Sequence, residues 1–474
     1  MKARKLHFVA IGGAGMSGLA LVAHARGADV TGSDRAESSY LQRLRDSGLE
    51  PSLGHDAANV PADAEVVVST AIAADNPELA IARERGQLVL HRGELLAELC
   101  AERRLVAVAG THGKTTTAAM CVHALRGIGA DPSFFLGGEL PGAGAAGAPA
   151  NAGWGAGEWV VAEADESDGS FLDLRPEVAV ITNLEFDHHS RWTSLAELRV
   201  AFAAFAAPAQ GLAAEASVAL PDGPERRQLR FALEPPPGEP PAPPAGLVAE
   251  RIEAGEEGGI RFHARGAGLD VDVSLPVPGR HNVANALAAL AALTLAGFDP
   301  GATAEALGGF RGVARRLELK GERAGARVYD DYAHHPTEVR ATLEAARELG
   351  AQRLIAVFQP HLYSRTKALA PEFGAALAAA DEIAVLEIYP AREQPVGALA
   401  GVSGRAIAEA AADRAGGKPV WWLPDAELAE RALAPRLGPG DLLLTIGAGD
   451  VYRLADALVA GRGDGDGRAD GGEP

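Results

Sequence analysis

One stretch of this chain restricts the possible folds more than any other: an apolar run that leads through a glycine-bounded turn to a lysine. Residues 105–109 read Leu-Val-Ala-Val-Ala, the turn extends from Gly110 to Gly113, and Lys114 begins a run of helical composition. Backbone N–H groups of a tight turn, the start of a helix and an ammonium group together bind phosphate oxygens. The stretch therefore predicts a strand, a phosphate-binding loop and a helix in an α/β domain.

This loop is two residues shorter than the general phosphate-loop motif, Gly-x4-Gly-Lys-[Ser/Thr]. Val108 stands where the first glycine of that motif would fall. A Gly-Lys turn that merely begins a helix is therefore the structural alternative. The functional interpretation is a nucleotide phosphate site with Mg²⁺ on the hydroxyl of Thr115. Its residues, in order, are Gly110, Thr111, His112, Gly113, Lys114, Thr115 and Thr116.

A second glycine motif lies near the start of the chain, where residues 6–34 read as strand, turn, helix and strand. The glycines follow the spacing Gly13-x-Gly15-x-x-Gly18, and Asp34 ends the second strand. In a Rossmann-like unit Gly13 permits the turn, Gly15 admits a pyrophosphate, Gly18 packs helix on strand, and Asp34 meets ribose or base. The motif alone fits NAD, FAD or a nucleotide sugar, and a purely structural turn stays open.

Length and charge restrict the class of protein. A chain of 474 residues should hold about three domains. Apolar residues make up 47% and charged residues 23%, as in soluble globular proteins. The formal charge of −19 argues against nucleic acid or an anionic membrane as the main partner. Cys100 and Cys121 have no metal-ligand spacing, and no segment predicts export or a membrane span, so we expect a cytoplasmic protein.

Acidic side chains follow two apolar runs in the middle of the chain. The run at 158–162 leads into Glu163-Ala-Asp-Glu-Ser-Asp168, and the run at 178–182 leads into residues 183–189, which include His188. Parallel strands that end in acids and histidine beside a phosphate loop predict a hard-cation site. Solvated acidic turns are the structural alternative.

Polar clusters also follow strands in the last third, at 330–336, 359–365 and 447–449. We therefore predict an α/β fold of three domains. These are a Rossmann-like N-terminal domain (1–103), a central phosphate-loop ATPase domain with a mainly parallel sheet (104–314), and a C-terminal Rossmann-like α/β domain (315–460). The proline-rich residues 234–244 predict a surface excursion in polyproline form, and 461–474 a disordered tail.

Six segments in this order closely resemble motifs of the Mur ligases of peptidoglycan synthesis. The resemblance covers roughly residues 5 to 460, and six spaced motifs are far more specific than one. It implies an enzyme that uses ATP and Mg²⁺ to join L-alanine to the lactyl carboxylate of UDP-N-acetylmuramate through an acyl phosphate. The six segments are 110–115, 163–168, 183–188, 279–282, 330–338 and 358–361.

The resemblance also implies roles for single residues. Gly13, Gly15, Gly18 and Asp34 belong to the UDP-sugar domain, and residues 110–116 bind ATP with Lys114 as a catalytic group. Thr115 and Glu163 would hold one metal ion and His188 a second. Asn282 and Asn285 match adenine contacts, and Arg316 and Asp331 match groups that close over the nucleotide. Tyr332, His334 and Arg365 fall in the amino-acid site, with His334 and Arg365 also catalytic; purely structural roles for these three stay open.

Two departures from the family pattern stand out. Relatives commonly have arginine after Phe-Gln-Pro-His, whereas this chain has Leu362, so Arg365 would have to do more. No lysine occurs between Lys114 and Lys320, so the carbamylated lysine of several Mur ligases has no counterpart. That absence agrees with the alanine-adding branch.

Two other activities and a third possibility, a non-catalytic nucleotide-binding regulator, remain open at this stage. The oligomeric state is expected to be monomer or weak homodimer. A recycling ligase would add a tripeptide to the same sugar nucleotide, and the third domain would decide between the two. An NAD-dependent oxidoreductase would use the first glycine motif and Asp34, but the loop at Gly110 would then have no role.

Overall fold

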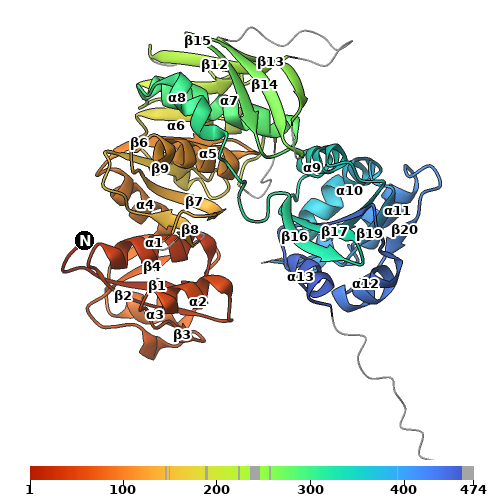
Figure 1. Cartoon of the computed structure of the whole chain (residues 1–474). Coiled ribbons are helices and arrows are strands. Elements are labelled where there is room, and N and C mark those ends of the chain that lie inside the picture. Colours follow the sequence, from red (N-terminus) through yellow and green to blue (C-terminus); the bar gives the residue numbers. More distant parts are fainter. Residues whose placement is uncertain are drawn as a thin grey trace, which may run out of the picture. The chain divides into compact units, whose positions relative to one another are not determined.

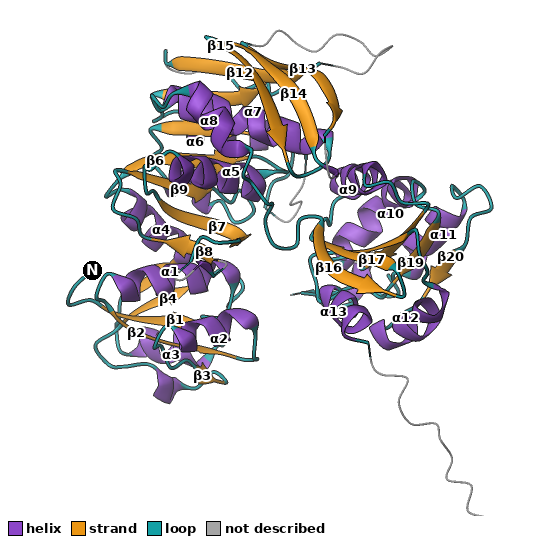
Figure 2. Cartoon of the chain, in the orientation of Figure 1, coloured by secondary structure: helices purple, strands orange, loops and turns teal. Residues whose placement is uncertain are grey.

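The computed structural model describes residues 1–144, 147–148, 150–186, 191–221, 225–234, 246–255, 258–391 and 393–461. The chain forms two compact units, Met1–Ala314 and Arg315–Pro474. Figure 1 follows the chain by colour, and Figure 2 shows helices interleaved with the strands of three sheets. The predicted three-domain α/β fold with mainly parallel sheets is confirmed.

The first sheet has five parallel strands in the order β3-β2-β1-β4-β5. The order reverses between β1 and β4, where α/β sheets commonly bind ligands. A 3₁₀ turn at Ala57–Asn59 completes this part. The strands are β1 (Lys5–Val9), β2 (Asp29–Asp34), β3 (Ser52–Leu53), β4 (Glu65–Val68) and β5 (Val89–His91). The helices are α1 (Ala14–Ala25), α2 (Ser39–Asp46), α3 (Pro77–Glu84) and α4 (Arg92–Cys100).

The second sheet has ten strands in the order β15-β14-β13-β12-β11-β10-β6-β9-β7-β8. Its middle is parallel, whereas β13, β14 and β15 pair antiparallel, as do β7 and β8. The strands are β6 (Arg104–Ala109), β7 (Ser133–Leu140), β8 (Ala150–Gly153), β9 (Trp159–Glu163), β10 (Val178–Ile181), β11 (Gly211–Glu215), β12 (Arg227–Leu233), β13 (Leu247–Ala254), β14 (Ile260–Gly266) and β15 (Leu269–Leu275). The helices are α5 (Lys114–Gly127), α6 (Leu195–Ala206), α7 (Arg280–Leu295) and α8 (Pro300–Leu307), with a 3₁₀ turn at Ser170–Asp173.

Two buried cores cover the faces of this second sheet. One contains α5 and α7, and the alanine-rich α7 is buried along most of its length, as its composition predicts. The other core is shared with the first sheet, because it joins Phe8 of β1 and Leu19 of α1 to Val160 of β9 and Phe202 of α6. The two sheets of this unit are therefore not packed as separate bodies.

The second unit contains one six-stranded sheet in the order β16-β17-β21-β18-β19-β20. β16 pairs antiparallel with β17, and the other pairs are parallel. Pro371 lies inside α10, where Leu369 leaves helical geometry and the helix kinks. The strands are β16 (Glu318–Arg323), β17 (Ala326–Asp331), β18 (Arg353–Phe358), β19 (Glu382–Val385), β20 (Val420–Trp422) and β21 (Asp441–Ile446). The helices are α9 (Pro336–Glu348), α10 (Tyr363–Leu377), α11 (Arg405–Ala412), α12 (Ala426–Leu433) and α13 (Tyr452–Ala460), with 3₁₀ turns at Gly397–Leu399 and Ala434–Arg436.

Several predictions fall outside the described residues. The proline-rich segment is described only at Glu234, the C-terminal tail only at Gly461, and His188 is not described. Among the helices that are described, none combines the length and the apolar character that a membrane crossing requires.

Candidate active site

The predicted phosphate loop connects β6 to α5, and two of its glycines have positive φ. Gly110 has φ 137°, and a Cβ there would collide with the hydroxyl of Thr182. Gly113 has φ 78°, and a Cβ there would collide with the carboxamide oxygen of Asn285. Glycine is therefore needed at both positions, for backbone conformation and for space. Helix α5 begins directly afterwards, at Lys114.

Lys114 points its ammonium group back over this loop. Nζ donates to the carbonyls of Gly110 (2.6 Å) and Thr111 (3.2 Å) and lies 2.9 Å from a carboxylate oxygen of the buried Glu166. Burial disfavours the charged amine, but the carboxylates of Glu166, Asp165 and Glu163 outweigh it and raise the pKa of Lys114. The ammonium is therefore charged at neutral pH and lies at the mouth of the loop.

Residues that follow β10 form hydrogen bonds to the same loop. The backbone N–H of His112 donates to Oδ1 of Asn183 (2.9 Å), and Nδ2 of Asn183 donates to the carbonyl of His112 (2.9 Å). The hydroxyl of Thr111 exchanges hydrogen bonds with the backbone of Glu185. The two parallel strand ends thus meet, as the sequence predicts.

Glu163 ends β9, next to β6, and faces the start of α5. Its Oε2 accepts from the hydroxyl of Thr115 (2.8 Å) and from the N–H of Gly137 (2.7 Å). A hydroxyl and a carboxylate beside a phosphate loop are the oxygen ligands that Mg²⁺ prefers. Thr116, the last loop residue, is buried.

The two asparagines at the start of α7 lie against this loop. Asn282 donates to the carbonyl of Pro278 (2.7 Å) and accepts at Oδ1 from Asn285 (3.3 Å). Asn285 in turn accepts from the hydroxyl of Thr117 (3.3 Å). Both are buried and share one face of the helix start, as their spacing indicates.

The glycine motif of the first sheet differs in detail from its prediction. Gly13 has φ −72°, an ordinary value, so the turn does not depend on it; Ala10, with φ 60°, makes the reversal. Gly18 does pack a helix on a strand, but the strand is β8 of the second sheet, where a Cβ would lie 2.9 Å from that of Ala152. Asp34 accepts from the N–H of Gly12 (2.9 Å) and so holds the loop in place.

Sequence reasoning missed Arg92, the first residue of α4. Its Nη2 lies 2.8 Å from both Asp165 and Asp168, which follow β9. Burial disfavours the charge of Asp165, but Arg92 and Lys114 outweigh it and hold the pKa of Asp165 far below its usual value. No motif surrounds Arg92 in the sequence, so only the contact reveals it. Glu166 and Asn183 were missed as site residues although both lie in recognised motifs.

In the second unit, Asp331 is a buried carboxyl at the end of β17. It accepts from the N–H groups of Leu317 and Ala333 (both 2.7 Å). Burial raises the pKa of Asp331 to about 6, against the attraction of Arg316. The guanidinium of Arg316 lies 5.3 Å from the ring of Tyr332. The neighbouring Arg315 pairs instead with Asp330 (2.9 Å).

Tyr332, His334 and Arg365 are connected through successive contacts that include His361. The rings of Tyr332 and His334 are 5.4 Å apart, and those of His334 and His361 are 5.9 Å apart. Arg365 is 6% exposed and places Nη1 3.4 Å from Nδ1 of His361. Burial, together with Arg365 and His361, lowers the pKa of His334 to about 3 against the pull of Glu338. The structure thus brings these predicted residues together within one domain.

Leu362 directly precedes α10 and has φ 72°, a conformation that residues with side chains rarely adopt. Its N–H donates to the carbonyl of Tyr389 (3.0 Å) and its carbonyl accepts from the hydroxyl of Thr366 (2.9 Å). Backbone hydrogen bonds therefore hold Leu362 in this conformation. Arg365 follows about one helical turn later, in α10.

The three sheets, the phosphate loop and the acids at neighbouring strand ends define a class: α/β proteins that bind nucleoside phosphates at the carboxyl edge of a parallel sheet. Three family models match consecutive stretches of the chain. They are the Mur ligase family catalytic domain at residues 5–104, the Mur ligase middle domain at 108–293, and the Mur ligase glutamate ligase domain at 315–449.

Curated relatives and solved structures agree. The chain is 46% identical to UDP-N-acetylmuramate–L-alanine ligase of Rubrobacter xylanophilus, over 96% of this chain and 99% of that one. It is 45% identical to the ligase of the same name from Renibacterium salmoninarum, over 96% and 95%. The crystal structure of UDP-N-acetylmuramate-alanine ligase from Thermotoga maritima superimposes with a TM-score of 0.81 at 30% identity, covering 96% of this chain and 98% of that one. The chain belongs to the Mur ligase family, as its six motifs predict.

Proposed function

We propose that this protein is an ATP-dependent amide-forming ligase that joins L-alanine to UDP-N-acetylmuramate. The similarity to enzymes of that name over nearly the whole chain supports this activity over the recycling ligase and over an NAD-dependent oxidoreductase. The observation that carries it is the loop at Gly110, with Lys114 held among Glu163, Asp165 and Glu166. An oxidoreductase would have no use for that loop.

The chemistry follows from the low reactivity of a carboxylate. The lactyl carboxylate of the sugar attacks the γ-phosphorus of ATP, ADP leaves, and an acyl phosphate forms. The amine of alanine then attacks the acyl carbon through a tetrahedral intermediate, phosphate leaves, and an amide remains. Overall, ATP, UDP-N-acetylmuramate and L-alanine become ADP, phosphate, one proton and the amide product.

Residues 104–314 would position ATP for the first step. The loop N–H groups and Lys114 would bind the phosphates, and in phosphoryl transfer such positioning supplies most of the catalysis. Asn282 and Asn285 would contact the adenine. The side chain of Asn285 also packs directly against Gly113. Residues 1–103, with Gly13, Gly15, Gly18 and Asp34, would bind the sugar nucleotide.

The residues near the loop fit a magnesium ion. Thr115 and Glu163 are hard oxygen donors 2.8 Å apart, and Glu163 has a second oxygen available to a cation. Mg²⁺ held there would shield the negative charge of the triphosphate. His188, expected to hold a second ion, lies outside the described residues.

Residues 315–460 would supply the amino acid and close over the nucleotide, the latter through Arg316 and Asp331. Arg365 suits the carboxylate of alanine, because a guanidinium pairs with a carboxylate through two parallel hydrogen bonds. Nδ1 of His334 lies 3.0 Å from the carbonyl of Tyr332, so Nδ1 carries the hydrogen and Nε2 the lone pair. With a pKa of about 3, His334 would orient the alanine amine as an acceptor and would not store its proton.

One assay tests the proposal: phosphate release from ATP should require both UDP-N-acetylmuramate and L-alanine. Glycine and L-serine should support slow release, because a methyl-sized difference discriminates by only about 1–3 kcal/mol. If the tripeptide L-Ala-γ-D-Glu-meso-diaminopimelate supported faster release than L-alanine at equal concentration, the recycling ligase would replace this assignment.

A further inference from the structure

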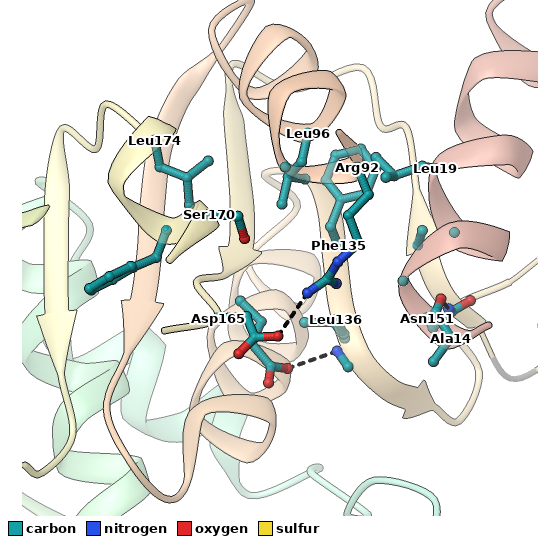
Figure 3. A pocket seen from close by; sticks show the side chains of 17 residues that line it. Ala14, Leu19, Arg92, Leu96, Phe135, Leu136, Asn151, Asp165, Ser170 and Leu174 are labelled. Atoms are coloured by element: carbon teal, nitrogen blue, oxygen red, sulfur yellow. Dashed lines mark hydrogen bonds and ion pairs between the residues drawn. The ribbon is translucent and has the colours of Figure 1, made fainter. Parts of the chain in front are cut away.

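Arg92 lies where the helices of the first sheet meet the end of β9 (Figure 3). Its Nη2 lies 2.8 Å from both Asp165 and Asp168. Its Nη1 lies only 2.9 Å from the point where a Cβ on Gly15 would stand. The absence of a side chain at Gly15 therefore lets the guanidinium reach the first turn of α1. One cation thus lies against elements of both sheets.

The guanidinium is held by two carboxylates and by the fixed start of its own helix. Helix α4 starts with a capping box, in which Nδ1 of His91 accepts from the N–H of Gly93 (3.2 Å) and Glu94 accepts from the N–H of His91 (2.6 Å). Asp165 and Asp168 each use one oxygen to accept a backbone N–H two residues later, at 2.9 Å, and the other oxygen to bind Arg92. The fork is therefore positioned before any ligand arrives.

A cavity of about 190 Å³ lies beside this arginine. Residues of α1, α4, β7 and β8 line it, together with Glu163 and Asp165. Asn151 is 1% exposed and lines the cavity. Its Nδ2 donates to the carbonyl of Ala14 (2.6 Å), whereas its Oδ1 is buried and has no hydrogen-bond partner among the described residues. A buried acceptor without a protein donor leaves a place in this cavity for a donor from water or from a ligand.

Asp165, one of the two acids bound by Arg92, also faces the phosphate loop. Asp165 is attracted by Arg92 and by Lys114 together, and its charge helps to raise the pKa of Lys114. Without Arg92, the negative charge of Asp165 would be left unpaired on that side, next to the cavity and the phosphate loop. Arg92 therefore has two separable effects, direct contact with an anion through Nη1 and neutralisation of the acids through Nη2.

We propose that Arg92 links the two nucleotide sites: Nη1 binds a phosphate of the sugar nucleotide at the start of α1, while Nη2, which also binds Asp168, holds Asp165 beside Lys114. This inference rests on the proposed function. Occupancy of either site should then favour occupancy of the other by the same factor, since binding linkage is reciprocal.

Calorimetric titration of the full chain with UDP-N-acetylmuramate, and separately with a non-hydrolysable ATP analogue and Mg²⁺, tests the proposal. Arg92→Gln should weaken sugar-nucleotide binding about 10- to 100-fold, the range for a lost charged hydrogen bond, and ATP-analogue binding several-fold. Arg92→Lys keeps the charge but not the fork. It should restore ATP-analogue affinity almost fully and sugar-nucleotide affinity only in part.

A double variant separates the two effects. Arg92→Gln with Asp165→Asn removes a charge of each sign, so it should recover ATP-analogue affinity but not sugar-nucleotide affinity. Arg104→Gln is the matched control. Arg104 also pairs with a carboxylate, that of Glu177 (2.6 Å), but it lies at the start of β6, whereas the phosphate loop follows the end of that strand. Thermal unfolding verifies that each variant is folded.

Two outcomes would overturn the inference. Sugar-nucleotide affinity of Arg92→Gln within twofold of the unaltered protein would show that Nη1 touches no phosphate. Recovery of both affinities in the double variant would show that Arg92 acts only by neutralising the acids and binds no phosphate. Failure of the unaltered protein to bind UDP-N-acetylmuramate at all would instead refute the proposed function itself.

Discussion

Replacement of Lys114 by methionine tests whether the loop at Gly110 performs the chemistry. The ammonium binds two loop carbonyls and Glu166, so it is already placed where phosphate charge would develop. Removal of one such preorganised group typically costs about 2.7–4 kcal/mol of transition-state stabilisation, or about 10²- to 10³-fold in kcat. Binding of UDP-N-acetylmuramate should change by less than about fivefold, because that ligand is assigned to the first domain.

Stability must be separated from catalysis in this experiment. Glu166 is 1% exposed, and loss of its cation would leave a buried charge, at a cost of about 3–5 kcal/mol. The double variant Lys114→Met, Glu166→Gln removes that charge and should regain stability without regaining activity. Lys320→Met is the control, because Lys320 pairs with Asp456 (3.0 Å) in the second unit. Phosphate release by a coupled assay gives kcat, and a Lys114→Met enzyme that kept more than about a tenth of it would refute the role of Lys114.

Three further predictions follow from buried or strand-end charges. Glu163→Gln should raise the Mg²⁺ concentration for half-maximal rate several-fold, and an unchanged dependence would remove Glu163 from the metal site. Arg365→Ala should raise KM for alanine about tenfold or more and leave that for ATP nearly unchanged; equal rises would point to a structural role. Glu78 is fully buried, but hydrogen bonds from Ser33 and Asn59, together with the imidazole of His7 at 3.7 Å, outweigh the burial and lower its pKa from 4.5 to about 2. Because the folded-state pKa is depressed, the carboxylate stabilises the protein above pH 4.5, by about 3 kcal/mol, and this is lost as the pH falls towards 2. Urea unfolding at several pH values should show a smaller acid-dependent loss in Glu78→Gln, and an identical loss in both proteins would contradict the argument.

Most of the fold could be predicted because local patterns and parallel-sheet topology agree. Apolar runs ending in glycine or acids mark β6, β9 and β10, and their carboxyl ends must meet at one edge. The phosphate loop was thereby placed beside the residues that end or directly follow β9 and β10, with Glu163 among them. Helix starts were less predictable: α1 begins at Ala14, within the glycine motif, and its Gly18 packs closely against Ala152 of β8.

Contacts between distant segments could not be predicted. Arg92 is 73 residues from Asp165, and nothing in the local sequence distinguishes it from a surface arginine at a helix start. The partner of Gly18 was likewise hidden, because the motif predicts a strand of its own sheet and the structure provides β8. Buried pKa values depend on the same long-range packing, as the carboxyl of Asp331 and the imidazole of His334 show.

The core shared by the first two sheets has a consequence for how the chain can be divided. Phe8 and Leu19 on one side and Val160 and Phe202 on the other are each at most 3% exposed. A fragment ending at residue 103 would turn this packed surface towards water and invite aggregation. Residues 1–314 are therefore the smallest N-terminal piece suited to separate production, and insertions or fusions are better tolerated after Ala314 than at the first domain boundary.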